Sequence, residues 1–199
     1  MIKPLLASLM CAAFLAGCAE KGKESPQAQI EAGIHTHQGP PKLTLITMIN
    51  NRTGAGGHSA LLVQGQQSVI FDPAGSFEHE KIPERGDVLY GMSPNWIQIY
   101  KSAHARSDFH VVSQEFVVTP AQAARAMQLV RSNGAVPSAF CANATSGILK
   151  QIPGFQSIQQ GFYPLKLMEQ VERLPGVKTS RYYEDDQGNV RDGVKGLSD

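Results

Sequence analysis

The chain has 199 residues, of which 42% are hydrophobic and 18% are charged. Its 18 Lys and Arg side chains nearly balance its 17 Asp and Glu side chains, so the formal net charge is +1. Nucleic-acid binding and electrostatic attachment to a membrane both favour a basic excess, and the composition argues against both. The length and the apolar fraction suit one globular domain of ordinary size.

Residues 1–18 have the layout of a signal peptide. Lys3 precedes an apolar segment that is too short to cross a bilayer as a stable helix. The segment ends in the letters LAGC, which resemble the lipobox of bacterial lipoproteins. The resemblance implies that Cys18 carries lipid and becomes the first residue of the mature chain. The alternative is a plain secretory signal that is cut after a small residue.

A lipidated Cys18 would make the membrane a partner of this protein and the cell envelope its location. Ala19 gives no cue for retention in an inner membrane, by analogy with known lipoprotein sorting. In a cell with an outer membrane, we therefore expect the protein on that membrane, facing the periplasm. Cys11 leaves with the signal peptide, so Cys141 is the one free thiol and no internal disulfide is expected.

Residues 19–41 are polar and contain Gln, Gly and Pro without a sustained apolar period, which predicts a flexible tether. His35 and His37 lie in this segment, but two ligands in a mobile segment bind a metal weakly. We expect a solvated loop there. Residues 42–199 then form a single domain.

The strands are expected first and the helices afterwards. Alternating, β-branched residues predict a strand at 42–50 and a hairpin at 58–72 with its turn near 64–67. Such an order favours an α+β fold, an antiparallel sheet with helices packed on one side. Further strands are expected at 87–92 and 110–119, helices at 120–133, about 138–152 and 164–174, and an exposed hairpin or loop at 178–193.

Cys141 is expected in the first turn of a helix, because Ser138 can cap that helix after Pro137. Unpaired backbone N–H groups and the positive end of the helix dipole favour a thiolate at such a position. The same N–H groups could hold the oxyanion of a tetrahedral intermediate. The alternative is a buried cysteine that acts as a small hydrophobic side chain.

The predicted hairpin brings His58, at the start of one strand, to the same rim as Asp72, at the end of the other. Asp72 could accept a hydrogen bond from the imidazole and fix its tautomer, as the third member of a catalytic triad does. Alternatively, Asp72 simply starts a turn and His58 is a capping or surface histidine. If His58 is not the working histidine, His104 could take that role. His104, Asp108 and His110 fit no metal-binding template, so we expect no metal and no cofactor.

These residues resemble the papain-like superfamily that includes the NlpC-type cell-wall peptidases. HSALLVQGQQSVIFDPAG is similar to the histidine-bearing hairpin of that superfamily, and FCANATSG carries the cysteine. The order, histidine before cysteine, is similar to the circularly permuted branch with the lecithin retinol acyltransferase-like proteins. The likeness spans residues 43–152, although 77–110 has no counterpart in it.

The resemblance implies a permuted papain-like fold in which Cys141 attacks an amide, His58 serves as general base and then acid, and Asp72 orients His58. Peptidoglycan peptides are the substrate that it implies, and the sequence assigns no substrate-binding residue. Two alternatives stay open. One is a non-catalytic envelope lipoprotein that uses the fold for binding or structure, and the other is a lipid amidase or acyltransferase.

Overall fold

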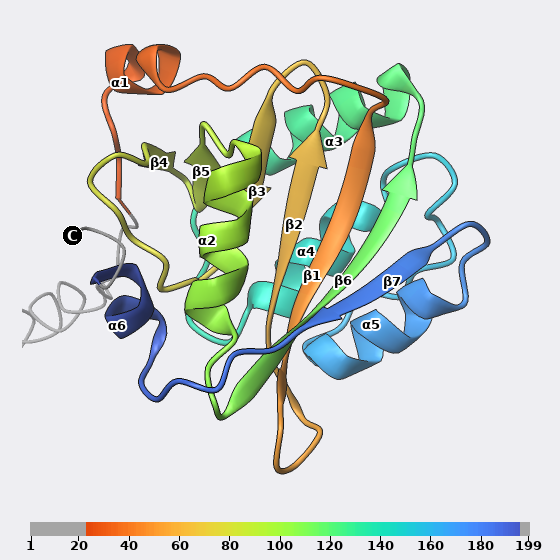
Figure 1. The fold of residues 1–199 in the computed structure, drawn as a ribbon. Helices are drawn as coiled ribbons and strands as arrows, with labels where there is room; N and C mark the ends of the chain where they lie inside the picture. The colour runs from red at the N-terminus through yellow and green to blue at the C-terminus, as the bar shows by residue number, and fades with distance from the viewer. Residues whose placement is uncertain (1–22, 196–199) are drawn as a thin grey trace, which may run out of the picture.

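The computed structural model describes residues 23–195, which form an α+β fold around one antiparallel sheet (Figure 1). Within the described residues, the sheet has seven strands in the order β4-β5-β3-β2-β1-β6-β7. The predicted strand at 42–50 and the predicted hairpin are both confirmed. The strands are β1 (Lys42–Asn50), β2 (Gly56–Gln64), β3 (Ser68–Phe71), β4 (Glu84–Arg85), β5 (Val88–Tyr90), β6 (Phe109–Val117) and β7 (Lys178–Tyr182).

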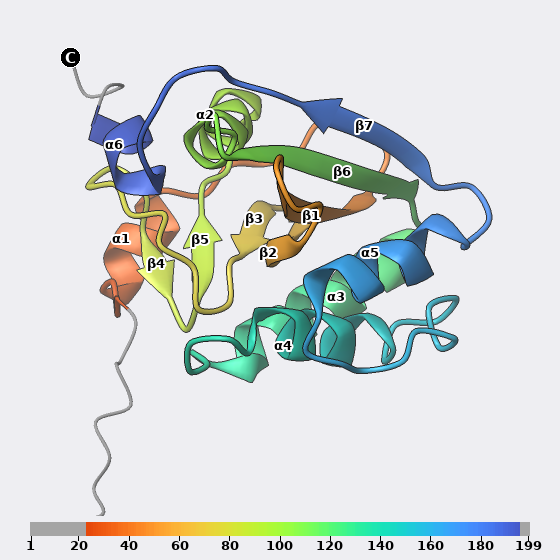
Figure 2. The same cartoon turned by 90° about the horizontal axis from the view of Figure 1, so that it is seen from below.

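Helices cover both faces of the sheet, so the expectation of helices on one side is wrong (Figure 2). The reason lies in β1, where seven successive residues are buried and neighbouring side chains point to opposite faces. Leu43 and Leu45 pack under α3, α4 and α5, whereas Ile46 and Met48 pack under α2. The helices are α1 (Gln27–Ala32), α2 (Pro94–His104), α3 (Pro120–Asn133), α4 (Cys141–Leu149), α5 (Pro164–Glu172) and α6 (Val190–Lys195).

Helix α3 begins and ends where the sequence predicts. The Thr119 side chain accepts from the backbone of Gln122, whose side chain bonds back to Thr119, and Pro120 occupies the first turn. Gly134 follows the helix with a φ of 74°, a left-handed value that favours glycine. Local sequence is therefore sufficient to fix this helix.

The C-terminal region is more ordered than expected, and the predicted exposed hairpin or loop is wrong for most of it. Residues 178–182 form β7, which extends the sheet by pairing with β6 from Val111 to Glu115. Most β7 side chains are exposed or half-buried, so no apolar alternation reveals this edge strand in the sequence. Asn189 then accepts hydrogen bonds from the backbone of the first turn of α6.

The N-terminal segment packs on the domain, so the expected flexible tether is wrong for residues 23–41. Ser25 donates its N–H to the Glu84 carbonyl, and Glu84 donates its own N–H to the Ser25 hydroxyl. Ile30 in α1 is only 5% exposed and belongs to the same apolar core as Tyr90. The tether prediction missed this contact because a single buried Ile among polar residues gives no periodic pattern.

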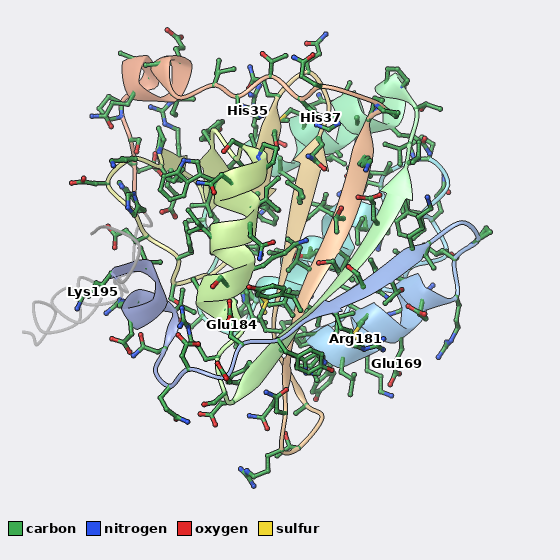
Figure 3. All side chains as sticks on the ribbon, in the orientation of Figure 1. His35, His37, Glu169, Arg181, Glu184 and Lys195 are labelled. Atoms are coloured by element: carbon green, nitrogen blue, oxygen red, sulfur yellow. The ribbon has the colours of Figure 1, made fainter. Side chains whose placement is uncertain are left out.

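His35 and His37 also lie on the domain rather than in a solvated loop. The His35 carbonyl accepts the N–H of Ser68, and the His37 ring contacts the Gln64 amide, at the turn end of the hairpin. Figure 3 shows both histidines over one end of the sheet, at the opposite end from Glu184.

Residues 1–22, with the proposed signal peptide and Cys18, lie outside the described residues. Within residues 23–195, no helix has the length and the apolar character needed to span a bilayer.

Docking of the N-terminal segment can be tested with Ile30→Ala. We expect this variant to lower the free energy of unfolding by about 2–4 kcal/mol, because it removes buried methyl groups and leaves a cavity. Ile34→Ala is the matched control, since Ile34 is 41% exposed and should change stability by less than about 0.5 kcal/mol. Urea denaturation measures both values, and equal small effects would show that the segment is not docked.

Candidate active site

The end of the hairpin brings His58 and Asp72 together, as predicted. Strand β2 extends beyond β3, because the last pair between them joins Leu61 to Phe71. Asp72 follows directly after that pair, and its Oδ1 atom lies 2.7 Å from His58 Nε2. The Asp72 side chain is 3% exposed and that of His58 is 16% exposed, so this bond is shielded from water.

A tight turn holds the carboxylate in place. Gly75 donates its N–H to the Asp72 carbonyl at 2.9 Å, and Ala74 between them has a φ of 55°. A Cβ atom on Gly75 would lie only 1.9 Å from Asp72 Oδ2. Glycine at position 75 is therefore required for the carboxylate to occupy this place.

Cys141 is the first residue of α4, which confirms its predicted place in the first turn. The expected cap is wrong, however, because the N-cap is Phe140 and no side chain caps the helix. Ser138 lies in a turn that continues through Ala139, whose φ is 70°. Without a capping side chain, the first-turn N–H groups stay free for the sulfur or for a bound group.

The sulfur meets both the imidazole and the backbone of β2. Asp72 occupies Nε2 of His58, so Nδ1 is the ring atom left for the thiol–imidazole hydrogen bond. The N–H groups of Ser59 and Ala142 also bond the sulfur. Ser59 lies beyond the last β2–β3 pair, and the shortness of β3 therefore leaves its N–H available.

The electrostatics favour an ion pair between the sulfur and the imidazole. Burial by itself would raise the pKa of Cys141, but the hydrogen bond and charge of His58 bring it below its ordinary value. Burial would likewise lower the pKa of His58, but the charge and hydrogen bond of Asp72, with a smaller contribution from Cys141, raise it to about 10. Both directions favour a thiolate beside an imidazolium over a neutral thiol beside a neutral ring.

Tyr100 is a fourth member of this network that the sequence does not reveal. Its hydroxyl donates to Asp72 Oδ1 at 2.6 Å, so His58 and Tyr100 share one carboxylate oxygen. Burial would raise the pKa of Asp72, but the charge of His58 and the hydrogen bonds from both residues lower it. Tyr100 lies on α2, in the stretch 77–110 for which the resemblance offers no counterpart.

His104 occupies a supporting position next to this network. Its Nδ1 atom donates to the Tyr100 carbonyl at 2.7 Å, and its ring stacks 6.1 Å from that of His58. Burial lowers the pKa of His104 to about 4, so its ring is neutral at pH 7. The geometry therefore favours His58 as the working histidine.

The three candidate metal ligands, His104, Asp108 and His110, do not form one cluster. His110 bonds Asn51 on the exposed surface, whereas His104 is buried against Tyr100. Between residues 23 and 195, no group of three His, Cys, Asp or Glu side chains could hold a metal ion.

Asp87 connects the two loops that carry the acid and the nucleophile. Its Oδ2 atom accepts the N–H of Ala74 at 3.1 Å and that of Val136 at 2.9 Å. Its carbonyl accepts the N–H of Asp72 at 2.8 Å. Because Val136 lies in the loop that leads to Cys141, Asp87 fixes the turn after Asp72 relative to the start of α4.

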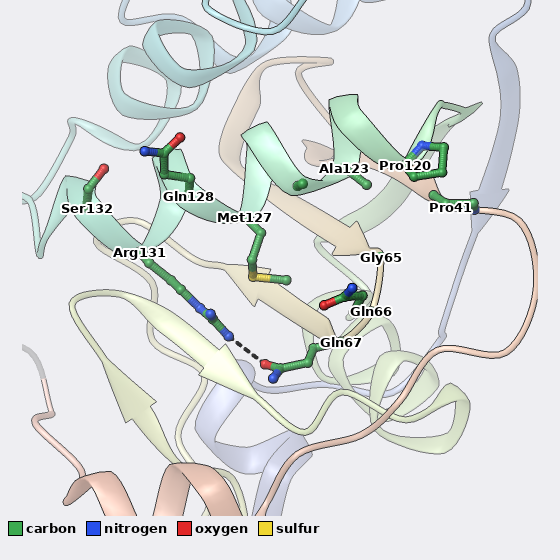
Figure 4. A pocket seen from close by; sticks show the side chains of 11 residues that line it. Pro41, Gly65, Gln66, Gln67, Pro120, Ala123, Met127, Gln128, Arg131 and Ser132 are labelled. Atoms are coloured by element: carbon green, nitrogen blue, oxygen red, sulfur yellow. Dashed lines mark hydrogen bonds between the residues drawn. The ribbon is translucent and has the colours of Figure 1, made fainter.

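A cavity of about 260 Å³ opens beside His58. Among the described residues, its apolar walls include Met48, Phe109 and Val190, and its titratable side chains are His58 and His104. A larger cavity of about 780 Å³ lies between α3 and the turn of the hairpin, where Arg131 bonds Gln67 (Figure 4). That turn is the opposite end of the hairpin from His58, so the larger cavity is separate from the candidate site.

Comparison of the chain with models of protein families, with curated proteins and with solved structures found no match. The chemistry of the site must therefore be inferred from its own geometry.

The state of Cys141 can be tested by measuring its alkylation rate against pH. A lowered thiol pKa keeps the thiolate, and hence fast alkylation, at pH values below the ordinary thiol pKa of about 8.5. The rate should fall only as the pH drops through the lowered value. In His58→Ala the pKa should rise to about 8.5 or above, which slows alkylation at pH 7 by roughly tenfold or more. A shift in His104→Gln but not in His58→Ala would make His104 the working histidine.

Asp87 can be tested with a pair of substitutions. Asp87→Ala leaves two backbone N–H groups without an acceptor, and we expect it to lower the free energy of unfolding by about 1–3 kcal/mol. It should also raise the thiol pKa, because the loop before Cys141 is released. Asp87→Asn keeps a side-chain oxygen and tolerates the φ of 62°, so it should restore most of both properties. Equal behaviour of the two variants, in denaturation and in alkylation, would contradict the positioning role.

Proposed function

We propose that this protein is a lipid-anchored thiol hydrolase of the cell envelope that cleaves an amide bond. Cys141 is the nucleophile, His58 the general base and acid, and Asp72 the residue that orients His58. One observation carries the proposal: one hairpin and a helix distant from it in the sequence form a continuous chain of sulfur, imidazole and carboxylate. This is the arrangement that activates a nucleophile in enzymes of this type.

In the first half of the reaction, the Cys141 thiolate attacks the carbonyl carbon of the substrate, and a C–S bond forms. The carbonyl π electrons move to the oxygen, which the free N–H groups of the first turn of α4 stabilise. The His58 imidazolium then gives its Nδ1 proton to the leaving nitrogen, and the C–N bond breaks. The products of this half are an amine and a thioester on Cys141.

In the second half, water replaces the amine. Neutral His58 takes a proton from the water, whose oxygen attacks the thioester carbon. The C–S bond breaks, a carboxylic acid leaves, and Cys141 is again a thiolate beside the imidazolium. Asp72 stays ionised throughout, because two hydrogen bonds and the charge of His58 hold its pKa low.

A permuted papain-like fold is part of the proposal. In its support, the helix that begins with Cys141 packs on β2, the strand that carries His58, within an antiparallel sheet. The acid follows on the neighbouring strand β3, and the histidine precedes the cysteine in the chain.

Peptidoglycan peptides are the proposed substrate, and attachment through Cys18 to an outer membrane, facing the periplasm, is the proposed location. A lipid amidase or acyltransferase is the second candidate, and the cavity beside His58 favours it. Its lining among residues 23–195 includes the apolar side chains of Met48, Phe109 and Val190 and no Lys, Arg, Asp or Glu, which suits an apolar part of a substrate.

The decisive experiment is digestion of purified sacculi with the wild type and with Cys141→Ser. We expect new muropeptide fragments from the wild type and a loss of about a thousandfold or more in the variant, because the hydroxyl is not activated as the thiolate is. A parallel reaction with lipid amides separates the two candidates. If neither substrate is cleaved although Cys141 alkylates at neutral pH, hydrolysis is excluded for both, and a binding or structural lipoprotein is the better account.

A further inference from the structure

Three exposed aromatic side chains gather near the start of α4, the helix that begins with Cys141. Phe140, which directly precedes it, is 39% exposed, Phe162 is 51% exposed and Tyr163 is 72% exposed. The rings of Phe140 and Phe162 meet edge to face at 5.1 Å. Leaving large aromatic side chains in water costs free energy. We call these three residues the aromatic rim.

Hydrogen bonds to α4 hold the segment that leads to Phe162 and Tyr163. Gly161 donates its N–H to the Ser146 hydroxyl at 3.2 Å, and the Gln160 amide bonds Asn143, so the segment before Phe162 is attached to α4. Phe140 is the N-cap of the same helix. The exposure of the rim is therefore a property of the folded framework.

The N-terminal segment docks close to the loop that leads to the rim. Glu24 forms a β-bridge with Arg85. A Cβ atom on the next residue, Gly86, would lie 3.2 Å from Gly134 Cα. The loop that begins at Gly134 leads to Phe140, and Figure 2 shows β4 and this loop on the same side of the molecule. A short series of contacts therefore connects Glu24 in the N-terminal segment with Phe140 in the aromatic rim.

The length of chain before Glu24 limits the distance between the membrane and the side of the domain that carries β4. Five residues lie between the proposed lipid on Cys18 and Glu24, and the six Cα–Cα steps from Cys18 to Glu24 span at most about 20 Å when fully extended. A domain of this size has a radius of gyration of about 16 Å and hence a diameter of roughly 40 Å. A bilayer that holds the lipid must then lie on the side of the domain that carries β4.

We infer that the aromatic rim contacts the bilayer surface, so that the start of α4, with Cys141, faces the membrane. This inference rests on the proposed lipidation of Cys18 but not on the proposed chemistry. Aromatic side chains are favoured at the membrane–water interface, where an apolar ring and a polar end are both accommodated. A site in this orientation would receive substrates that are themselves held in the membrane.

The inference can be tested by fluorescence quenching of the mature lipoprotein in phosphatidylcholine vesicles, with or without bromine on the acyl chains. Phe140→Trp and Phe162→Trp place reporters in the rim. Tyr183→Trp is the matched control, because Tyr183 is 58% exposed and directly follows β7, which Figure 2 shows on the opposite side of the molecule from α4. The signal of the native Trp96, present in every protein, is measured in the parent and subtracted.

We expect brominated lipid to reduce the emission of the rim reporters about twofold and to leave the Tyr183→Trp control nearly unchanged. Absence of quenching at the rim, or equal quenching of all three reporters, would overturn the inference, as would mass spectrometry showing no lipid on Cys18. Each measurement is repeated in Cys141→Ser. Quenching that persists there, in a protein without hydrolase activity, would support the membrane contact even if the proposed chemistry were wrong.

Discussion

The hydrogen bond between His58 and Asp72 determines the state of the whole site. It exists because β3 stops at Phe71, so that the next residue can turn its carboxylate back toward the longer strand β2. The buried carboxylate keeps His58 protonated, and the protonated ring in turn lowers the pKa of Cys141. If β3 were longer, Asp72 would enter the sheet and could no longer bond His58. The N–H of Ser59 would then pair with β3 instead of the sulfur.

Two residues outside the triad keep this arrangement rigid. Tyr100 supplies a second hydrogen bond to the carboxylate from α2, and Asp87 joins the turn after Asp72 to the loop before Cys141. Because α2 and α4 lie on opposite faces of the sheet, the triad is supported from both sides. Helices on one side alone, as the order of elements suggested, could not provide this support.

The sequence predicts those parts of the site that local patterns determine. Alternation and a tight turn placed His58 beside Asp72, and the start of a helix placed Cys141 in its first turn. Tyr100 could not be predicted, since its role depends on the packing of α2 against the sheet and no spacing encodes that contact. The docked segment around Ile30 and the edge strand β7 were missed for a related reason, because long-range pairing rather than apolar periodicity holds them.

The docked N-terminal segment changes what an anchor on Cys18 would do. A flexible tether would let the cleft sample all directions, whereas a segment fixed at Ser25 and Glu84 leaves only a short link to the membrane. Orientation then follows from the fold, because the surface around β4 is the part that the link can bring to the bilayer.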